Sequence, residues 1–521
     1  MWYLLLIPFV AMQLIAGRHY LHMLQLESYQ LNMYFKWLSK NAWYKAPVLC
    51  LIPFAAAIYA ALIETLPELF FGIIAVLIII IMGMIFAVAD RVAQKKKPLV
   101  YTARVKRQIV MHIIILLVIG FAVIRLLPLK ASVLLLIGMM LLPALFTALA
   151  AVAALPFEKA VQRQFFNEAR GKLADMDVIK IGVTGSYGKT SVKFILGTIL
   201  SEKYETLVTP SSYNTPMGVT RVIRETLSPK HQVFVAEMGA RYKGDIRELC
   251  DLVKPDYGVI TAIGPQHLET FGSIENVAAT KLELIDSLGE KGTAFLPDDG
   301  GICADAYFAI EGKKKVLFGL SERCDVRAEE IKTGPEGSSF DIVCRPGRIN
   351  VTAVLLGRHN VLNIVAGAAV ALELGLTLEQ IAAGISKIEP IEHRLQLIKG
   401  PITVIDDAFN SNPAGSRAAL DVLASFEGRK IIVTPGLVEQ GSAEEEANRA
   451  FGRNIAATAD LAILVGKSFS QHIKDGLLEE GFDEKNIIMA DSLAKVSEMM
   501  PGITKPGDVV LFENDLPENY K

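Results

Sequence analysis

Five apolar runs in the first 156 residues most constrain how this chain can fold. They cover about residues 1 to 17, 46 to 63, 69 to 89, 109 to 128 and 132 to 155. Each is long enough, or nearly so, to cross a hydrocarbon core that needs roughly 20 helical residues. The first run has the length of a signal peptide, but it lacks a basic start and four more runs follow. We therefore expect residues 1–156 to form a transmembrane region of about five helices.

The rest of the chain has a different composition. Hydrophobic residues make up 52% of the sequence and the mean hydropathy is +0.37, and nearly all of that excess lies before Phe157. The remainder is typical of a soluble α/β protein. With 53 basic and 55 acidic residues there is no basic stripe, so we expect no nucleic-acid partner. The five scattered cysteines fit neither a zinc ribbon nor a disulfide scaffold.

Loop charge predicts the orientation of these spans. The segment "DRVAQKKKPLVYTARVKRQ" (90–108) contains seven Lys or Arg, whereas "ETLPE" (64–68) contains none. Basic loops stay in the cytoplasm, so counting five crossings places the N-terminus outside and everything after residue 156 inside. This predicts a multi-pass protein of the cell membrane whose catalytic domains lie in the cytoplasm. We interpret the basic loop mainly as a topology signal, with contact to anionic membrane lipid as the alternative.

The spans themselves contain almost no ionisable residues apart from His112. A transporter would usually place charges near the middle of the membrane. We therefore interpret the spans as an anchor or docking surface. A bundle that holds a lipid-linked substrate between its helices is the alternative.

A glycine-rich loop follows an amphipathic connector at 157–174. The stretch "GVTGSYGKTSVK" (182–193) lies between the strand-like "VIKI" and the helix-like "KFILGTIL". Glycines allow a backbone to approach a phosphate closely, and a helix N-terminus presents free N–H groups to it. Lys189 would reach the outer phosphates and Thr190 would hold magnesium. The nucleotide contacts predicted from this loop are Gly185, Ser186, Gly188, Lys189, Thr190 and Ser191.

The spacing G-x-x-G-x-x-G-K-T in this loop resembles the Mur ligases and folylpolyglutamate synthases. Further segments follow in the order of the Mur ligase family, namely "YNTPMGVTR" (213–221), "VFVAEMGARYKGDI" (233–246), "YGVITAIGPQHLETFGSIENVAATKLELIDSL" (257–288) and "LLGRHNVLNIVAGAAVALELG" (355–375). The resemblance covers residues from about 175 to the C-terminus. It implies a central ATP-binding domain with a phosphate loop at 175–388 and a Rossmann-like C-terminal domain at 389–521.

Metal contacts are implied at Thr190, Glu237, His267 and Lys281. Glu237 ends the second predicted strand, where a carboxylate suits a hard cation; taken alone, it could equally be a surface residue. In the family, the histidine binds a second magnesium ion and the lysine is carbamylated. By resemblance His267 and Lys281 inherit these roles, although an isolated histidine at a strand end is more often a capping or core residue. The implied cofactors are ATP, two Mg²⁺ ions and a carbamylated Lys281.

Two further segments complete the implied nucleotide site. Asn360 and Asn363 match the family's helix whose amides meet adenine, although a helix of small residues packed on the sheet would look similar. The segment "HRLQLIKGPITVIDDAFNSNPAGSRAALDVLASF" (393–426) resembles the start of the family's C-terminal domain. Arg394 and Asp407 would then contact the ribose and phosphates when that domain closes. The segment departs from the family pattern at two positions. His393 stands where the family has a glycine, and Phe409 stands where the family has a tyrosine. Asn410 and Asn412 are typical of turns before proline.

The resemblance implies an ATP-dependent amide ligase that acts through an acyl phosphate, with Lys189, His267, Lys281 and Arg394 as catalytic residues. The segment at 393–426 is most similar to the branch of the family that adds D-alanyl-D-alanine. The implied partners are membrane lipid, the carboxylate of a cell-wall precursor at the cytoplasmic face, and an amino acid or dipeptide. Two alternatives stay open: a membrane-bound poly-gamma-glutamate synthase-like ligase, and a scaffold or transport component that only binds ATP.

Overall fold

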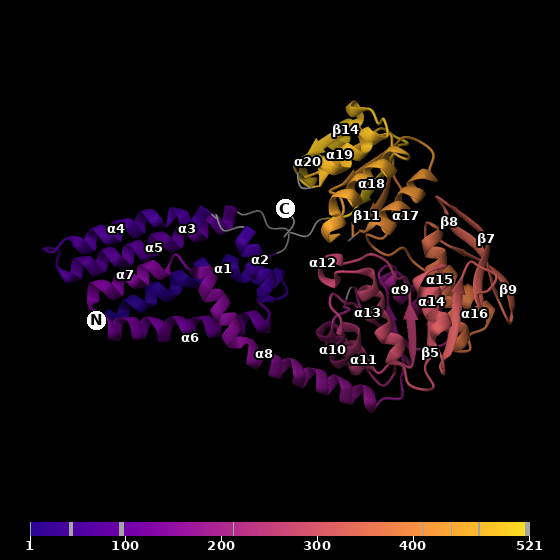
Figure 1. Ribbon diagram of the computed structural model, residues 1–521, viewed down its shortest axis with the longest axis horizontal. Helices are drawn as coiled ribbons and strands as arrows, with labels where there is room; N and C mark the ends of the chain where they lie inside the picture. The colour runs from indigo at the N-terminus through magenta and orange to yellow at the C-terminus, as the bar shows by residue number, and fades with distance from the viewer. Residues whose placement is uncertain are drawn as a thin grey trace. The chain divides into compact units, whose positions relative to one another are not determined.

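The computed structural model describes residues 2–40, 45–92, 98–211, 213–409, 411–438, 440–466 and 469–515. It contains two compact units, residues 1–163 and 164–521, each considered by itself below (Figure 1). The first unit is helical. Its described helices are η1 (Trp2–Leu5), α1 (Leu6–Leu26), α2 (Leu31–Lys40), α3 (Lys45–Leu49), α4 (Leu51–Leu62), α5 (Glu68–Val92), α6 (Ala103–Leu126), α7 (Leu129–Met139) and the first part of α8 (Pro143–Ala174).

Four stretches among the described residues are long and apolar enough to cross a membrane: Tyr3–Leu26, Glu68–Val92, Ala103–Leu126 and Pro143–Ala174. The predicted span at 46–63 corresponds to a shorter apolar stretch, Ala46–Leu62, which consists of the successive helices α3 and α4. Large apolar side chains face outward on this unit, among them Ile52, Tyr59 and Val118 with 72%, 71% and 62% of their surface exposed. Outward apolar surface of this kind suits a bundle surrounded by lipid.

The predicted span at 132–155 is interrupted, because α7 ends at Met139 and α8 begins at Pro143. Proline has no N–H to donate to the carbonyl four residues earlier, which here belongs to Met139. That carbonyl instead accepts hydrogen bonds from Leu142 N at 3.0 Å and from Gln13 Nε2 at 2.9 Å. A buried glutamine on α1 therefore satisfies the carbonyl that the break between α7 and α8 leaves free.

The segment 157–174, predicted as a separate connector, is the second half of the continuous helix α8. Its end packs in the second unit against α10 (Pro216–Glu225). Lys172 Nζ donates to the carbonyls of Ile223, Arg224 and Leu227 at 2.8, 3.2 and 2.6 Å. The lysine thus satisfies carbonyls at and beyond the C-terminus of α10, and it fixes the start of the second unit.

The second unit contains a nine-stranded sheet in the order β2-β3-β1-β4-β5-β6-β7-β8-β9. The strands from β2 to β7 are parallel, and β7, β8 and β9 form an antiparallel extension. The residues between β6 and α15 therefore extend this sheet. The strands are β1 (Ile179–Thr184), β2 (Thr206–Val208), β3 (Val233–Glu237), β4 (Tyr257–Ile260), β5 (Thr293–Pro297), β6 (Lys314–Gly319), β7 (Val326–Gly334), β8 (Gly337–Cys344) and β9 (Gly347–Ala353).

Helices cover both faces of this sheet. Successive residues of its buried strands point to opposite sides, so apolar side chains must be buried on each face. Val233 and Val235 pack with α9, α15 and α16, whereas Phe234 and Ala236 pack with α10, α11 and α13. The remaining helices of this part are α9 (Lys189–Leu200), α11 (Asp245–Val253), α12 (Leu268–Phe271), α13 (Ile274–Asp286), α14 (Ile302–Ala309), α15 (Arg358–Glu373) and α16 (Leu378–Ser386).

A second sheet of six strands has the order β10-β11-β15-β12-β13-β14, parallel except for β10. Helices α17 to α19 pack on one face and α20 on the other. The elements are β10 (Gln396–Ile398), β11 (Thr403–Asp407), α17 (Pro413–Ala424), β12 (Lys430–Thr434), η2 (Gly441–Ala443), α18 (Glu444–Ala456), β13 (Leu461–Val465), α19 (Ser470–Glu479), η3 (Glu484–Asn486), β14 (Ile487–Ala490), α20 (Leu493–Ile503) and β15 (Val509–Glu513).

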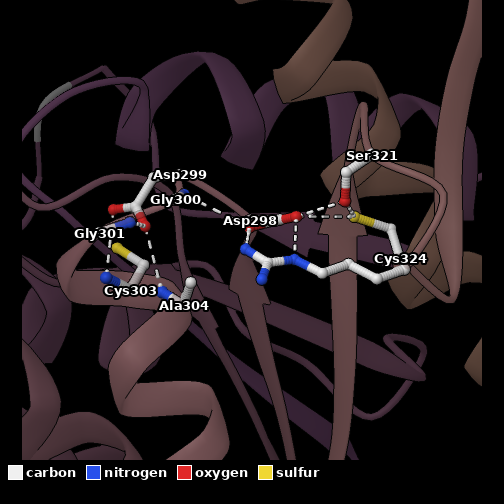
Figure 2. A network of polar contacts seen from close by, with 9 residues as sticks. Asp298, Asp299, Gly300, Gly301, Cys303, Ala304, Ser321 and Cys324 are labelled. Atoms are coloured by element: carbon white, nitrogen blue, oxygen red, sulfur yellow. Dashed lines mark hydrogen bonds and ion pairs between the residues drawn. The ribbon is translucent and has the colours of Figure 1, made fainter.

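Two acidic residues that directly follow the carboxyl end of β5 form a polar network (Figure 2). Asp299 accepts hydrogen bonds from the N–H groups of Gly301, Cys303 and Ala304 at 2.9 to 3.1 Å and so caps α14. Asp298 pairs with Arg323, whose Nε lies 2.7 Å from Oδ2. Both carboxylates are used within the fold, so the network holds the turns after β5 and β6 together.

Candidate active site

The glycine loop lies between β1 and α9, at the carboxyl end of a strand paired in parallel with β3 and β4. Ser186 N donates to Ala262 O at 2.7 Å, and Ser186 Oγ donates to Gly264 O at 2.9 Å. A Cβ on Gly185 would lie 2.1 Å from Thr261 Oγ1 and 3.0 Å from Ala262 N. The loop therefore rests on the segment that follows β4, and only glycine fits at position 185.

Strand β4 ends at Ile260, well before His267. Residues 261–267 form a loop that leads to His267 at the start of α12. The strand ends early because Ala262 and Gly264 bond Ser186 instead of a neighbouring strand. The shorter strand places these backbone groups beside the glycine loop.

Gly188 lies at the N-cap of α9 with φ of 78°, a left-handed conformation that glycine adopts without strain. A Cβ there would lie 2.7 Å from Asn363 Oδ1, so α15 packs closely against the loop. Thr190 and Ser191 lie in the first turn of α9, and Ser191 is buried. The free N–H groups of this turn and the helix dipole favour a phosphate at this position.

Lys189 is folded back onto the loop. Its Nζ donates to Gly185 O at 2.6 Å and to Ser186 O at 3.1 Å. Burial, helped by nearby Arg394 and opposed by Glu237, lowers the pKa of Lys189 to about 8. The ammonium is thus held at the base of the loop by two weak neutral acceptors, which a phosphate group would outcompete.

Glu237 ends β3 beside the first turn of α9, and its carboxylate is the centre of a polar cluster. Oε1 accepts from Thr190 Oγ1 at 3.2 Å and from Asn214 Nδ2 at 3.0 Å, while Oε2 accepts from Lys193 Nζ at 3.0 Å. Burial alone would raise the pKa of Glu237, but Lys193, Asn214 and Lys189 outweigh it and hold the pKa below its usual value. The carboxylate is therefore kept ionised.

Lys193 is a residue that the sequence analysis missed. Its side chain is fully buried, and besides Glu237 it contacts Ser211 O at 2.5 Å. The signal available in the sequence was its position, four residues after Lys189 and so on the same face of α9. Lys193 neutralises one oxygen of Glu237 and leaves the other facing Thr190.

His267 directly precedes α12, and Lys281 lies in α13, the helix that follows it. Ser273 caps α13, with Asn276 N donating to Ser273 Oγ, and Lys281 lies two turns further along, 1% exposed. Within the described residues the Lys281 ammonium has no hydrogen bond or ion pair, and it lies 5.9 Å from the Phe271 ring centre. Burial, with a smaller effect of Lys189, lowers the pKa of Lys281 well below its usual value. His267 is half-buried in a left-handed conformation.

The predicted metal set is only partly assembled. Thr190 and Glu237 are in direct contact. Among the described residues there is no cluster of three or more His, Cys, Asp or Glu side chains arranged to hold a metal ion. The roles of His267 and Lys281 as metal contacts therefore stay predictions.

The two asparagines of α15 contact each other, with Asn363 Nδ2 donating to Asn360 Oδ1 at 3.0 Å. Asn360 is buried, and its Nδ2 donates to Leu356 O at 2.9 Å. Asn363 also faces Gly188 across the loop. The structure thus places both amides next to the glycine loop, while their contact with adenine stays a prediction.

Arg394 and Asp407 come from the part of the chain that forms the second sheet. The Arg394 guanidinium lies 4.2 Å over the Phe409 ring, and it is close enough to Lys189 to lower the pKa of that lysine. Burial lowers the pKa of Arg394, opposed by Asp407 and Glu237. Asp407 accepts from Leu395 N at 3.2 Å. These contacts position Arg394 toward the glycine loop.

Asp407 has a neighbour that the sequence did not reveal. Glu513 on β15 pairs in register with Asp407 on β11 and is fully buried. Burial raises the pKa of Asp407 to about 6, although Arg394 opposes the shift, and burial together with Asp407 raises the pKa of Glu513 well above its usual value. The buried carboxyl pair therefore favours a protonated Glu513 beside Asp407, whose charged form Arg394 stabilises.

The turn before α17 is as predicted at Asn412, whose Oδ1 accepts from Ala414 N and Gly415 N at 3.1 and 2.9 Å. Asn410 lies outside the described residues. His393, at the family's glycine position, has φ of 58°, which explains why glycine is natural there. Its Nδ1 lies 2.7 Å from Asp406 Oδ2.

A glycine loop on a parallel sheet, a buried lysine at its base and an ionised carboxylate at the next strand end define an α/β enzyme that binds a nucleoside triphosphate. Two family models match this unit: the Mur ligase middle domain at residues 183–371, and the Mur ligase glutamate ligase domain at residues 393–513. The chain belongs to the Mur ligase family, and it is an ATP-dependent ligase of that type. The resemblance predicted from the motifs is confirmed.

Individual relatives point the same way. UDP-N-acetylmuramoyl-tripeptide–D-alanyl-D-alanine ligase from Mycobacterium tuberculosis is 33% identical over 64% of this chain and 69% of its own length. Among solved structures, MurF from Acinetobacter baumannii has a TM-score of 0.63 and 28% identity, covering 69% of this chain and 78% of that one. MurF from Thermotoga maritima in complex with ADP has a TM-score of 0.61 and 25% identity, covering 68% and 80%.

Proposed function

We propose that this chain is a membrane-bound ligase that joins an amino acid or dipeptide to a carboxylate of a peptidoglycan precursor at the cytoplasmic membrane face. The observation that carries the proposal is the cluster of Lys189, Thr190 and Glu237 on the glycine loop of a Mur ligase core. The names of its relatives, which add D-alanyl-D-alanine to a UDP-N-acetylmuramoyl tripeptide, support this substrate class.

The chemistry requires activation, because a carboxylate is a poor electrophile. The acceptor carboxylate attacks the γ-phosphorus of ATP, the bond to the β-phosphate oxygen breaks, and an acyl phosphate and ADP form. The incoming amine then attacks the acyl carbon, loses a proton, and expels phosphate to leave an amide. Lys189 at the base of the loop would neutralise charge that develops on the transferred phosphoryl group.

The residues beside the loop fit magnesium. Thr190 Oγ1 and Glu237 Oε1 are oxygen ligands of the kind that this hard cation prefers, and Lys193 and Asn214 keep Glu237 ionised. Magnesium, when bound, would offset negative charge on the nucleotide phosphates. The protein's own contribution is to hold one carboxylate oxygen toward Thr190 and the other against Lys193.

Lys281 fits a carbamylated residue. Burial lowers the pKa of this amine well below its usual value and so favours the neutral form, which reacts with carbon dioxide to give a carbamate and a proton. Within the described residues no hydrogen bond or ion pair holds its ammonium, and the charges of Asp245 and Glu283 offset the lowered pKa only in part. The carbamate oxygens, together with His267, would then be available for a second cation.

Arg394 would act when the two parts of the second unit close on the nucleotide. Its charge interacts with those of Lys189 and Glu237. Its guanidinium stacks on the Phe409 ring, and Asp407 stabilises its positive charge. A guanidinium in this place suits a phosphate or ribose oxygen. Catalysis of this kind depends mainly on positioning, so closure by this segment supports the reaction as much as any single base.

The membrane assignment rests on the first unit. Arg107 on α6 pairs with Glu158 on α8 at 2.6 Å, so α8 passes the basic end of the bundle as it continues toward the ligase unit. Tyr3 stacks on Phe121, near the other end of α6. With basic residues retained in the cytoplasm, this arrangement supports an outside N-terminus and a cytoplasmic ligase unit.

The direct test uses full-length protein in detergent with ATP, Mg²⁺ and bicarbonate. UDP-N-acetylmuramoyl tripeptide or its lipid-linked form is offered with D-alanyl-D-alanine or single amino acids, and products are identified by mass spectrometry. We expect an amide product with the wild type and with Lys230→Ala, a surface control, and none with Lys189→Ala. Release of ADP without a ligated product on any acceptor would contradict the cell-wall assignment and favour the polyglutamate or scaffold alternatives.

A further inference from the structure

A cavity of about 400 Å³ opens in the first unit between α1, α5 and the start of α6. This volume lies within the range of small-molecule pockets, roughly 300–1,000 Å³. All the residues that line it belong to the helical unit, so it is separate from the ATP site. Its polar lining consists of Arg18, Asp90, Arg91 and Tyr101.

The charges in this lining favour an anion. Asp90 is buried and already faces two basic groups, with Arg18 Nη1 at 3.7 Å and His19 Nδ1 at 3.4 Å. Arg91 has no ion pair or hydrogen bond from its guanidinium within the part of the chain that the structure describes. The cavity therefore presents one uncompensated guanidinium and a second that is held, at more than hydrogen-bond distance, by Asp90. Guanidinium groups bind phosphate through two parallel hydrogen bonds.

The rest of the lining is apolar. Leu14, Ile15, Ala87 and Ile109 form this part, and Ile15 is 38% exposed on the outer surface of the bundle. An anionic group bound by the arginines would thus have hydrocarbon surface directly beside it. A ligand with a charged head and an apolar tail matches this division, whereas a fully soluble anion would use only half of it.

The position of the cavity fits the level of lipid headgroups. It lies at the C-terminal end of α5 and the N-terminal end of α6, the helix ends that flank the basic segment 90–108. Arg107 and Glu158 pair at the same end of α6, where α8 passes. Basic side chains at this level attract anionic headgroups of the cytoplasmic leaflet.

We propose that this cavity binds the phosphate group of a membrane lipid, with the lipid tail along the apolar side formed by α1 and α5. The inference rests on the proposed membrane insertion and deepens the proposed function, because a lipid-linked acceptor would be held through its phosphate. Arg91 provides the main contact, and Arg18 and Tyr101 add donors.

The test measures binding of a fluorescent polyprenyl phosphate to full-length protein in phosphatidylcholine nanodiscs, without ATP. Arg91→Gln is the main variant, because Arg91 has no partner whose loss would disturb the bundle. Arg125→Gln is the matched control, since Arg125 is an exposed arginine in the last turn of α6 at the opposite end. We expect an affinity at least about 10-fold lower in Arg91→Gln, unchanged binding in Arg125→Gln, and partial binding in Arg91→Lys, which retains charge but not the planar fork.

Unchanged affinity in both Arg91→Gln and Arg18→Gln would overturn the proposal. Competition by inorganic pyrophosphate or UDP at the same concentration as unlabelled polyprenyl phosphate would overturn the lipid assignment, because the site would then bind free phosphates. The outcome is independent of ligation, since no ATP is present. A ligase that works on UDP-linked acceptor with unchanged KM in Arg91→Gln, but with raised KM for the lipid-linked form, would support the proposal.

Discussion

Lys193 and Glu237 form an ion pair in the interior of the second unit, with 3.0 Å between Nζ and Oε2 and side chains that are 0% and 1% exposed. The pair lies directly behind Thr190, whose hydroxyl contacts the other oxygen of the same carboxylate. A buried lysine that orients a carboxylate toward the nucleotide loop connects the packing of α9 to the chemistry of the site.

We expect Lys193→Met to weaken both folding and magnesium dependence. Removing one partner of a buried pair leaves the other charge unpaired, which costs about 3–5 kcal/mol. Without Lys193, burial would raise the pKa of Glu237, so the carboxylate would bind a cation less well. Thermal unfolding and a magnesium titration of ATP turnover check this. Lys230→Met, at an exposed loop, is the control, and an unchanged magnesium requirement in Lys193→Met would contradict the assigned role.

Nucleotide binding should depend on pH through Lys189. Its pKa is lowered to about 8, and the protonated form attracts phosphate, so ATP affinity should fall as the pH rises through about 8. Calorimetric titrations on both sides of this pH measure the effect. Lys189→Arg should give a flat profile, because a guanidinium keeps its proton. The same slope in that variant would assign the dependence to another group.

The same shift predicts the sign of a stability effect. The pKa of unfolded lysine is about 10.4, so between about 8 and that value the unfolded chain binds more protons than the folded chain. The free energy of unfolding therefore gains a term that increases with pH in this window. In Lys189→Met this contribution should be absent, as denaturant unfolding at several pH values would show.

Activity should require carbon dioxide if Lys281 is carbamylated. Burial lowers the pKa of its amine, which favours the neutral, reactive form. We expect removal of bicarbonate to lower amide formation about 10²-fold, and Lys281→Ala to lose activity regardless of bicarbonate. Partial rescue of Lys281→Ala by acetate would support a carboxylate-like role. Full wild-type activity in carbon dioxide-free buffer would exclude it.

Two glycine-to-alanine substitutions separate a functional glycine from a neutral one. Gly185→Ala would place Cβ 2.1 Å from Thr261 Oγ1 and 3.0 Å from backbone of Ala262, so the loop must shift and nucleotide binding should be lost. Gly171 lies inside α8 with nothing within 4 Å of its would-be Cβ. Gly171→Ala should stabilise the helix by about 0.5–1 kcal/mol. Binding and thermal unfolding of both variants test the contrast, and intact ATP binding in Gly185→Ala would refute it.

The parts of the site that were predictable from the sequence are those fixed by short motifs. The glycine loop and the strand-end Glu237 each depend on a few adjacent residues, and the structure places them as expected. Lys193 and Glu513 could not be found in this way. Lys193 depends on how α9 packs on β3, and Glu513 meets Asp407 only because β15 lies beside β11, about a hundred residues later in the chain.

The helical first unit shows a different limit. Hydropathy predicted the long apolar segments, but it does not distinguish one span from two short helices. The local signal was Pro143, since proline disrupts a helix at the preceding turn, yet Pro156 lies inside the continuous helix α8. Whether the chain breaks or continues depends on a partner such as Gln13, which satisfies the exposed carbonyl and is distant in sequence.

The central claim is that ATP activates the acceptor's carboxylate. The most direct measurement uses an acceptor whose carboxylate carries a heavy-oxygen label, incubated with full-length protein, ATP, Mg²⁺ and the amine, followed by mass analysis of the released phosphate. We expect one labelled oxygen in each phosphate, in equal amount with the amide formed, because the acyl phosphate passes that oxygen to phosphate when the amine attacks. Unlabelled phosphate released with ADP would show that water, rather than the carboxylate, takes the phosphoryl group, and it would contradict the ligase mechanism.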